Sequence, residues 1–202
     1  MADNPIETVE YGLFHFEYRT YPEIALREAL MNAFCHTDYR LSGPIMIKQF
    51  SRKLEISNLG GFIGGISPEN ILHHTPASRN PRLVDARARL RLVNRSSLGI
   101  QRMYSALLID GKEPPIIEEM GDSVKVSFLG GELSPSFRTF VTEENKKGLL
   151  LSVDHLLILH YLLRHTEVTT AEAANACQRN ESDVREILSE MERSLIYLER
   201  GG

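Results

Sequence analysis

The chain has 202 residues, of which 42% are hydrophobic and 25% charged, and its net charge is -4 at pH 7. This balance is typical of a globular protein with one or two folded domains and excludes a disordered or fibrous chain. The N-terminus has no basic signal-peptide segment, no apolar run approaches the roughly 20 residues of a membrane helix, and the two cysteines fit no zinc motif or disulfide framework. We therefore expect a cytoplasmic protein without a membrane partner.

The first predicted elements are strands, followed by a helix and a hairpin. Aromatic residues between positions 9 and 21 indicate one or two strands. Pro22 and the apolar residues that recur after it at three- and four-residue spacing predict an amphipathic helix over Tyr21–His36. Apolar and polar residues then alternate over Ile45–Phe50 and Lys53–Ser57, which predicts a β-hairpin with one buried face.

A glycine- and proline-rich segment follows between residues 58 and 80, and its length is more typical of a functional loop or lid than of a connector. Helices are predicted over Pro81–Leu92 and Ile100–Asp110, and a second hairpin over Ile116–Leu129. This alternation predicts an α/β sandwich in which helices lie on a mixed or antiparallel sheet.

The last part of the chain has a different pattern. Residues 131–148 are polar and charged and are predicted to form a linker. Three helices are then predicted over Ser152–His165, Thr169–Cys177 and Glu181–Arg193, with a strand over Leu195–Leu198, which together indicate a winged helix-turn-helix. We therefore assign residues 1–20 to a strand segment of the first domain or a linker, 21–130 to the α/β domain and 149–202 to the winged helix.

Polar residues on the first helix are candidates for a functional site. Glu28, Asn32 and His36 follow one another at four-residue spacing, so one helix face carries a carboxylate, an amide and an imidazole. By spacing alone, a solvated polar stripe on an amphipathic helix is the more common explanation of this pattern. A motif match is needed to decide between the two interpretations.

The helix sequence Arg27–Tyr39, REALMNAFCHTDY, resembles the REALxNAxxHRDY signature of the RecG-related GHKL domain. The resemblance implies a Bergerat-type nucleotide-binding fold with ATP and Mg²⁺ as cofactors. By position in the motif, Glu28 is expected to act as general base on the attacking water and Asn32 to hold Mg²⁺ against the triphosphate.

Further residues of the implied nucleotide site come from two short motifs. The sequence SNLGG at Ser57–Gly61 resembles the family's SNPGG, and Ser78–Pro81 resembles xRNP. Asn58 is expected to accept a hydrogen bond from adenine, while the glycines allow the base to approach the backbone. A tight turn that needs no ligand explains the glycines as well. The complete set of expected nucleotide-binding residues is Asn32, His36, Asn58, Gly60, Gly61, Arg79 and Gly99.

One departure from the family pattern affects the predicted activity. Where the family has ERWGTGI, this chain has Asn94–Ile100, NRSSLGI, so that Ser97 and Leu98 replace a Gly-Thr pair facing the phosphates. We therefore expect at most weak ATPase activity. A P-loop motor is excluded because Gly111-Lys112 is followed by Glu113 rather than by a hydroxyl residue.

The charge pattern leaves the partner open. Between residues 79 and 102 there are seven arginines and one aspartate, a stretch suited to phosphate contacts or to a solvated helix face. The predicted recognition helix over Glu181–Arg193 is acidic instead, which favours protein contact or a homodimer over DNA. We expect a transcriptional regulator or RecG-related DNA-associated protein. The alternative is a noncatalytic dimerisation scaffold with a degenerate pocket, and in either case a fragment of a longer protein.

Overall fold

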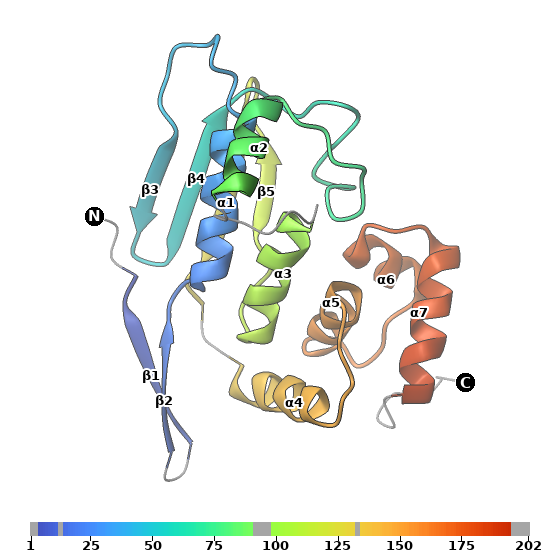
Figure 1. Cartoon of the computed structure of the whole chain (residues 1–202). Coiled ribbons are helices and arrows are strands. Elements are labelled where there is room, and N and C mark those ends of the chain that lie inside the picture. The colour runs from blue at the N-terminus through green and yellow to red at the C-terminus, as the bar shows by residue number, and fades with distance from the viewer. Residues whose placement is uncertain (1–3, 12–13, 91–97, 132–133, 195–202) are drawn as a thin grey trace.

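In the computed structural model of the chain, residues 4–11, 14–90, 98–131 and 134–194 are described (Figure 1). Strands β1 (Ile6–Tyr11) and β2 (Phe14–Arg19) pair as an antiparallel hairpin of their own. Strands β3 (Met46–Phe50), β4 (Lys53–Leu59), β5 (Ile116–Glu119) and β6 (Ser123–Leu129) form a sheet in the order β3-β4-β6-β5. Each neighbouring pair is antiparallel, so the expected α/β fold is confirmed with a purely antiparallel sheet in the described part.

Helix α1 (Glu23–His36) lies across one face of this sheet and packs against β4 and α3 (Gly99–Ile109). Its contact surface is built from small side chains, because Ala25, Ala29 and Ala33 are all buried. Small residues allow the helix backbone to come close to the sheet. The packing of α1 also places two of its polar residues, Glu28 and Asn32, beside Gly99 at the start of α3.

Strand β4 shows the alternation that the sequence predicts. Leu54, Ile56 and Asn58 are buried, while the residues between them are only half-buried. Two of these buried residues are apolar and one is an amide, which marks the end of the strand as a polar position in an otherwise apolar face. Helix α2 (Pro81–Arg89) begins after the long loop and carries no buried residue.

The segment predicted as a linker contains a helix. Helix α4 (Pro135–Lys146) lies within residues 131–148, and Phe137 and Val141 on it are buried. The charged composition of this segment is therefore the exposed face of an amphipathic helix rather than a solvated connector. The buried apolar residues form one continuous cluster from α1 to α7, so the core does not itself divide the chain into two units. The division into domains therefore remains a prediction.

Three helices complete the described chain: α5 (Val153–Leu162), α6 (Thr170–Cys177) and α7 (Glu181–Ser194). Both α5 and α6 begin with reciprocal capping boxes, formed by Ser152 with His155 and by Thr169 with Glu172. Figure 1 shows α5 beside α3, with α6 and α7 on its far side. The strand predicted over Leu195–Leu198 lies outside the described residues, so the winged helix stays a prediction.

Two further expectations can be compared with the described residues. Cys35 and Cys177 are both buried free thiols. Across the part of the chain that the structure describes, no helix combines the length and apolar character needed to span a bilayer.

Candidate functional site

A cavity of about 320 Å³ lies between the helix-covered face of the sheet, α1, the start of α3 and the long loop. We refer to it as the cavity. Apolar side chains from β4, β5 and β6 form its floor, and loop residues from Phe62 to Ser78 form an outer wall. Six residues predicted for the nucleotide site line it: Asn32, His36, Asn58, Gly60, Gly61 and Gly99.

Glu28 and Arg79 lie elsewhere. Glu28 lines a neighbouring groove, whereas Asn32, Asn58 and Gly60 line the cavity, so the catalytic role expected of Glu28 stays a prediction. Glu28 and Asn32 nevertheless lie on one face of α1, one turn apart, and both approach Gly99 at the start of α3. Arg79 does not line the cavity but stabilises the glycine turn by hydrogen bonds: its Nη2 donates to the Gly61 carbonyl at 2.8 Å and its Nη1 to Asp38 Oδ2 at 3.2 Å.

The start of α3 brings two oxygen atoms together. A Cβ built on Gly99 would lie 3.0 Å from Glu28 Oε2 and 3.8 Å from Asn32 Oδ1. Glu28 is only 2% exposed, and its Oε2 has no hydrogen-bond partner among the described residues. Its other oxygen, Oε1, lies 3.5 Å from Arg102 Nη1. One oxygen of a buried carboxyl group is therefore oriented by an arginine and the other is left open.

Among the described residues, no side chain caps the N-terminus of α3. Its N-cap residue is Leu98, whose side chain makes no capping hydrogen bond. The first N–H groups of a helix carry partial positive charge and need acceptors, so a ligand phosphate is a suitable partner here. The backbone of Leu98 has φ -95° and ψ 18°, which a leucine adopts without the glycine that the family has nearby. Its side chain lines the groove and not the cavity.

The glycine turn is required by the fold. Gly60 has φ 94°, and a Cβ there would lie 3.0 Å from Asp38 Cβ and 3.1 Å from Arg79 Nε. A Cβ on Gly61 would overlap the carboxylate of Glu119, which accepts a hydrogen bond from Phe62 N at 2.7 Å. The tight-turn interpretation of these glycines therefore holds whether or not a ligand also uses them.

Asn58 and the end of the loop have distinct roles. Asn58 Nδ2 donates to the Leu59 carbonyl at 3.2 Å, so the amide is oriented and its Oδ1 remains an available acceptor in the described structure. Asn80 Nδ2 donates to the carbonyls of Cys35 and Thr37 at 3.0 and 2.7 Å. The xRNP motif thus fastens the end of the loop to the C-terminus of α1, a role that the sequence did not reveal.

The far end of the cavity has a positive potential. Burial lowers the pKa of His36, and the nearby charges of Arg87 and Arg79 lower it further. Arg87 also lines the cavity. The sequence had placed Arg87 only in the basic stretch, since nothing in the local pattern shows which arginine of a helix turns inward. Asp38 is held ionised, because hydrogen bonds from Arg40 and the charge of Arg79 lower its pKa.

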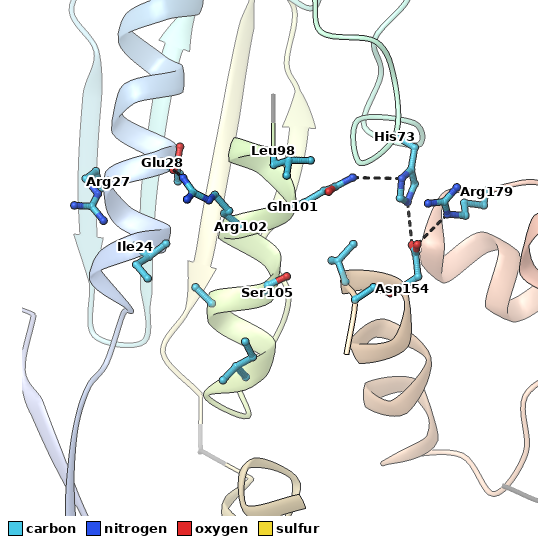
Figure 2. A pocket seen from close by; sticks show the side chains of 14 residues that line it. Ile24, Arg27, Glu28, His73, Leu98, Gln101, Arg102, Ser105, Asp154 and Arg179 are labelled. Atoms are coloured by element: carbon cyan, nitrogen blue, oxygen red, sulfur yellow. Dashed lines mark hydrogen bonds and ion pairs between the residues drawn. The ribbon is translucent and has the colours of Figure 1, made fainter. Parts of the chain in front are cut away.

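A second, more open depression of about 590 Å³ runs across α3, and we refer to it as the groove (Figure 2). Glu28 and Arg102 lie at its α1 side. At its other side His73 Nε2 lies 2.9 Å from Asp154 Oδ1, and Arg179 Nε donates to Asp154 Oδ2 at 2.9 Å. Sequence reasoning missed His73, Asp154 and Arg179, because they come from three distant segments and belong to no shared motif.

The comparisons with known proteins agree with the fold. Residues 42–128 match the family model described as "Putative ATP-dependent DNA helicase recG C-terminal". The predicted relationship to the RecG-related family is confirmed. The matched range includes the loop, Gly60 and Gly99, and it begins after α1, which carries Glu28 and Asn32.

A solved structure covers more of the chain. The DIP2311 protein from Corynebacterium diphtheriae is similar over 93% of this chain, with 30% sequence identity and a TM-score of 0.80. This chain spans 38% of the length of that protein's chain. The search of curated proteins found no match. An ATPase-like domain of the RecG-related kind is therefore the level at which the comparisons support a function.

Proposed function

We propose that the cavity binds an adenine nucleotide together with Mg²⁺, and that the chain is an ATPase-like regulatory module. The observation that carries this proposal is the convergence of Glu28 Oε2 and Asn32 Oδ1 on Gly99, at a helix start that lacks a side-chain cap. A buried carboxyl oxygen without a partner is costly, so its retention beside an open helix N-terminus favours a ligand that completes both.

The cavity suits the base and ribose. Its volume of about 320 Å³ is near the lower end of the range for small-molecule pockets, about 300–1,000 Å³. Its walls are largely apolar, with Asn58 as an oriented acceptor for an exocyclic amine. With the base near Asn58, the phosphates would extend toward Gly99.

The side chains present also fit Mg²⁺. Asn32 offers an amide oxygen, the donor type that this ion prefers, and Mg²⁺ commonly takes its other ligands from phosphates and water. Among the described residues no cluster of three His, Cys, Asp or Glu side chains forms a ready-made metal site, which agrees with an ion that arrives with the nucleotide. When bound, Mg²⁺ would neutralise phosphate charge.

For hydrolysis, Glu28 is the group that would accept the proton of the attacking water at Oε2. Arg102 would keep Oε1 occupied and so direct Oε2 toward the start of α3. The first N–H groups of α3 would stabilise charge on the phosphate oxygens. Ser97 and Leu98 stand where the family has a Gly-Thr pair that faces the phosphates. The phosphates are therefore expected to be positioned poorly, and ATP turnover is expected to be slow.

The output of the module is proposed to lie on two surfaces. Helix α2 exposes Arg82 and Arg89, which suit a phosphate backbone, whereas α7 exposes a row of acidic side chains that suit a protein partner or a second copy. The exposed acidic residues on α7 are Glu181, Asp183, Glu186 and Glu190. The proposal therefore assigns DNA contact to α2.

Calorimetric titration of the whole chain with ATP, ADP and GTP, each with and without Mg²⁺, tests the nucleotide site. We expect adenine nucleotides to bind and Asn32→Ala to weaken Mg²⁺–ATP binding about tenfold or more, since one lost polar contact of about 1.4 kcal/mol has that effect. Asn175→Ala, on the exposed surface of α6, is the matched control. Absence of binding to the wild-type chain would favour the noncatalytic scaffold.

Duplex DNA binding measured over a salt series tests the assignment to α2. The double variant Arg82→Gln, Arg89→Gln should weaken binding and lower the slope of affinity against salt concentration. Arg185→Gln on α7 is the control, because its guanidinium is paired with Glu181 at 3.2 Å. A larger loss with Arg185→Gln would place the DNA surface on α7 instead.

A further inference from the structure

The loop that forms the outer wall of the cavity is fastened to the C-terminal helices at one point. Leu72 and His74 line the cavity, while His73 between them lines the groove on the opposite side. Adjacent side chains in this turn therefore face two different sites, and Figure 2 shows His73 directed toward Asp154. A displacement of His73 would move the cavity wall with it.

The contacts at this point come from three elements. Asp154 on α5 accepts from His73 at 2.9 Å and from Arg179, which follows α6, at 2.9 Å. Since a carboxylate only accepts, His73 Nε2 carries the proton, and its Nδ1 faces the amide of Gln101 on α3 at 3.5 Å. Asp154 is 4% exposed and satisfied from both sides.

The backbone of Leu72 is held in the same way. Its N–H donates to Gln178 Oε1 at 3.0 Å and its carbonyl accepts from Gln101 Nε2 at 2.9 Å. Gln178 has φ 55°, which makes it the single non-glycine residue with positive φ in the described part of the chain. A left-handed glutamine is unfavourable by itself, so the surrounding contacts hold it in place.

We propose that Asp154 is a positioning residue for the cavity: acting through His73, it holds the loop wall so that the placement of α5 and α6 sets the affinity for the nucleotide. The inference rests on the proposed function for the identity of the ligand. By linkage, a ligand that needs the wall in place also stabilises the docking of α5 and α6 against the loop. A displacement of α5 and α6 would in this way change the affinity of the cavity, and a ligand in the cavity would change how firmly α5 and α6 are docked.

Four single variants of the whole chain and one double variant test this inference. His73→Ala removes the loop side of the contact, Asp154→Ala removes the helix side, and His73→Gln restores a donor near the position of Nε2. Arg164→Ala is the matched control, because Arg164, two residues after α5, donates from Nη1 to Glu113 at 3.0 Å, a bond between the same two parts of the chain that does not involve the loop. Affinity for ADP with Mg²⁺ is measured by calorimetry, and amide hydrogen exchange is measured over residues 62–80.

We expect His73→Ala and Asp154→Ala each to weaken ADP binding about tenfold, within the usual range of coupling between sites. The double variant, His73→Ala with Asp154→Ala, should bind ADP no more weakly than Asp154→Ala alone, because that change already removes the His73–Asp154 contact together with the bond to Arg179. His73→Gln should recover most of the affinity and Arg164→Ala should retain the wild-type value. Loop amides should exchange faster in the first two variants only.

Unchanged affinity and unchanged loop exchange in His73→Ala would overturn the inference. An equal loss in Arg164→Ala would do so as well, because it would show a general effect of stability. If the wild-type chain binds no nucleotide, the proposed function fails, and the positioning role then stands or falls on loop exchange alone.

Discussion

Polar groups are buried in two different ways on the two sides of the groove. On the α1 side, Glu28 keeps one oxygen without a partner in the described structure, and α3 begins without a side-chain cap. On the C-terminal side, Asp154 is bonded by both His73 and Arg179, and α5 and α6 begin with complete capping boxes. Since an unsatisfied buried polar group costs about 1–3 kcal/mol, the difference shows which side gives up stability to keep groups open for a ligand.

The largest effect on activity is expected from a change at Glu28. If Glu28 had no effect on activity, the contrast between its open oxygen and the fully bonded Asp154 would have no functional meaning. Glu28→Gln keeps the shape of the side chain and removes the proposed base, so the slow ATP turnover expected of the wild type should fall at least about 100-fold. Thermal stability should stay equal or rise, because a neutral amide costs less to bury than a carboxylate at this 2% exposed position. A phosphate-release assay and a thermal melt measure both. Brisk turnover in the variant would contradict the role of Glu28.

The glycine turn gives the next largest effect. Gly60→Ala places a Cβ at φ 94° and 3.0 Å from Asp38 Cβ, so it should destabilise the fold by about 2 kcal/mol and weaken ligand binding. Gly148→Ala is the matched control: its φ is 90°, but a Cβ there meets nothing within 4 Å. Denaturant unfolding of both variants separates the cost of crowding from that of the backbone angle. Equal losses would show that crowding at Gly60 is unimportant.

A capping variant sharpens the comparison from the C-terminal side. Thr169→Ala removes the acceptor for Glu172 N at 3.2 Å and should lower the free energy of unfolding by about 1 kcal/mol without changing nucleotide affinity by direct contact. Ser134→Ala, at the start of α4, serves as control because Ser134 makes no capping hydrogen bond with its side chain. A loss at Ser134 equal to that at Thr169 would remove the argument from capping.

The smallest effect concerns pH. Burial and the charges of Arg87 and Arg79 lower the pKa of His36 below its ordinary 6.5, so the unfolded chain takes up this proton before the folded one does. The free energy of unfolding is therefore highest where His36 is neutral in both states, above its ordinary pKa of 6.5. It decreases as pH falls through 6.5, because the unfolded chain binds the proton first, and it stops decreasing once the folded chain is protonated as well. His36→Gln should flatten unfolding free energy against pH between about 7 and 5, and Arg87→Gln should reduce the slope. A steeper dependence in His36→Gln would refute this assignment.

Local patterns predicted most of the elements, and the reasons are specific. The four-residue row of Glu28, Asn32 and His36 and the alternation along β4 both survive in the fold, because each is set by the geometry of one helix or strand. The segment over residues 131–148 was predicted as a linker because its charged residues outnumber its apolar ones. Phe137 and Val141 show that α4 is a helix with a buried face only once the residues that cover them are known.

The sequence by itself determined the order of the helices and hairpins, the relationship to the RecG-related family, and six residues that line one cavity. Only the tertiary structure decided that Glu28 faces the groove, that Arg79 and Asn80 support the turn and the loop end, and that His73 meets Asp154 across 81 positions of sequence. Periodicity and motifs report on neighbours along one element. Which face of α1 meets the start of α3, and which loop residue meets α5, depends on how separate elements pack together, and no local pattern contains that information.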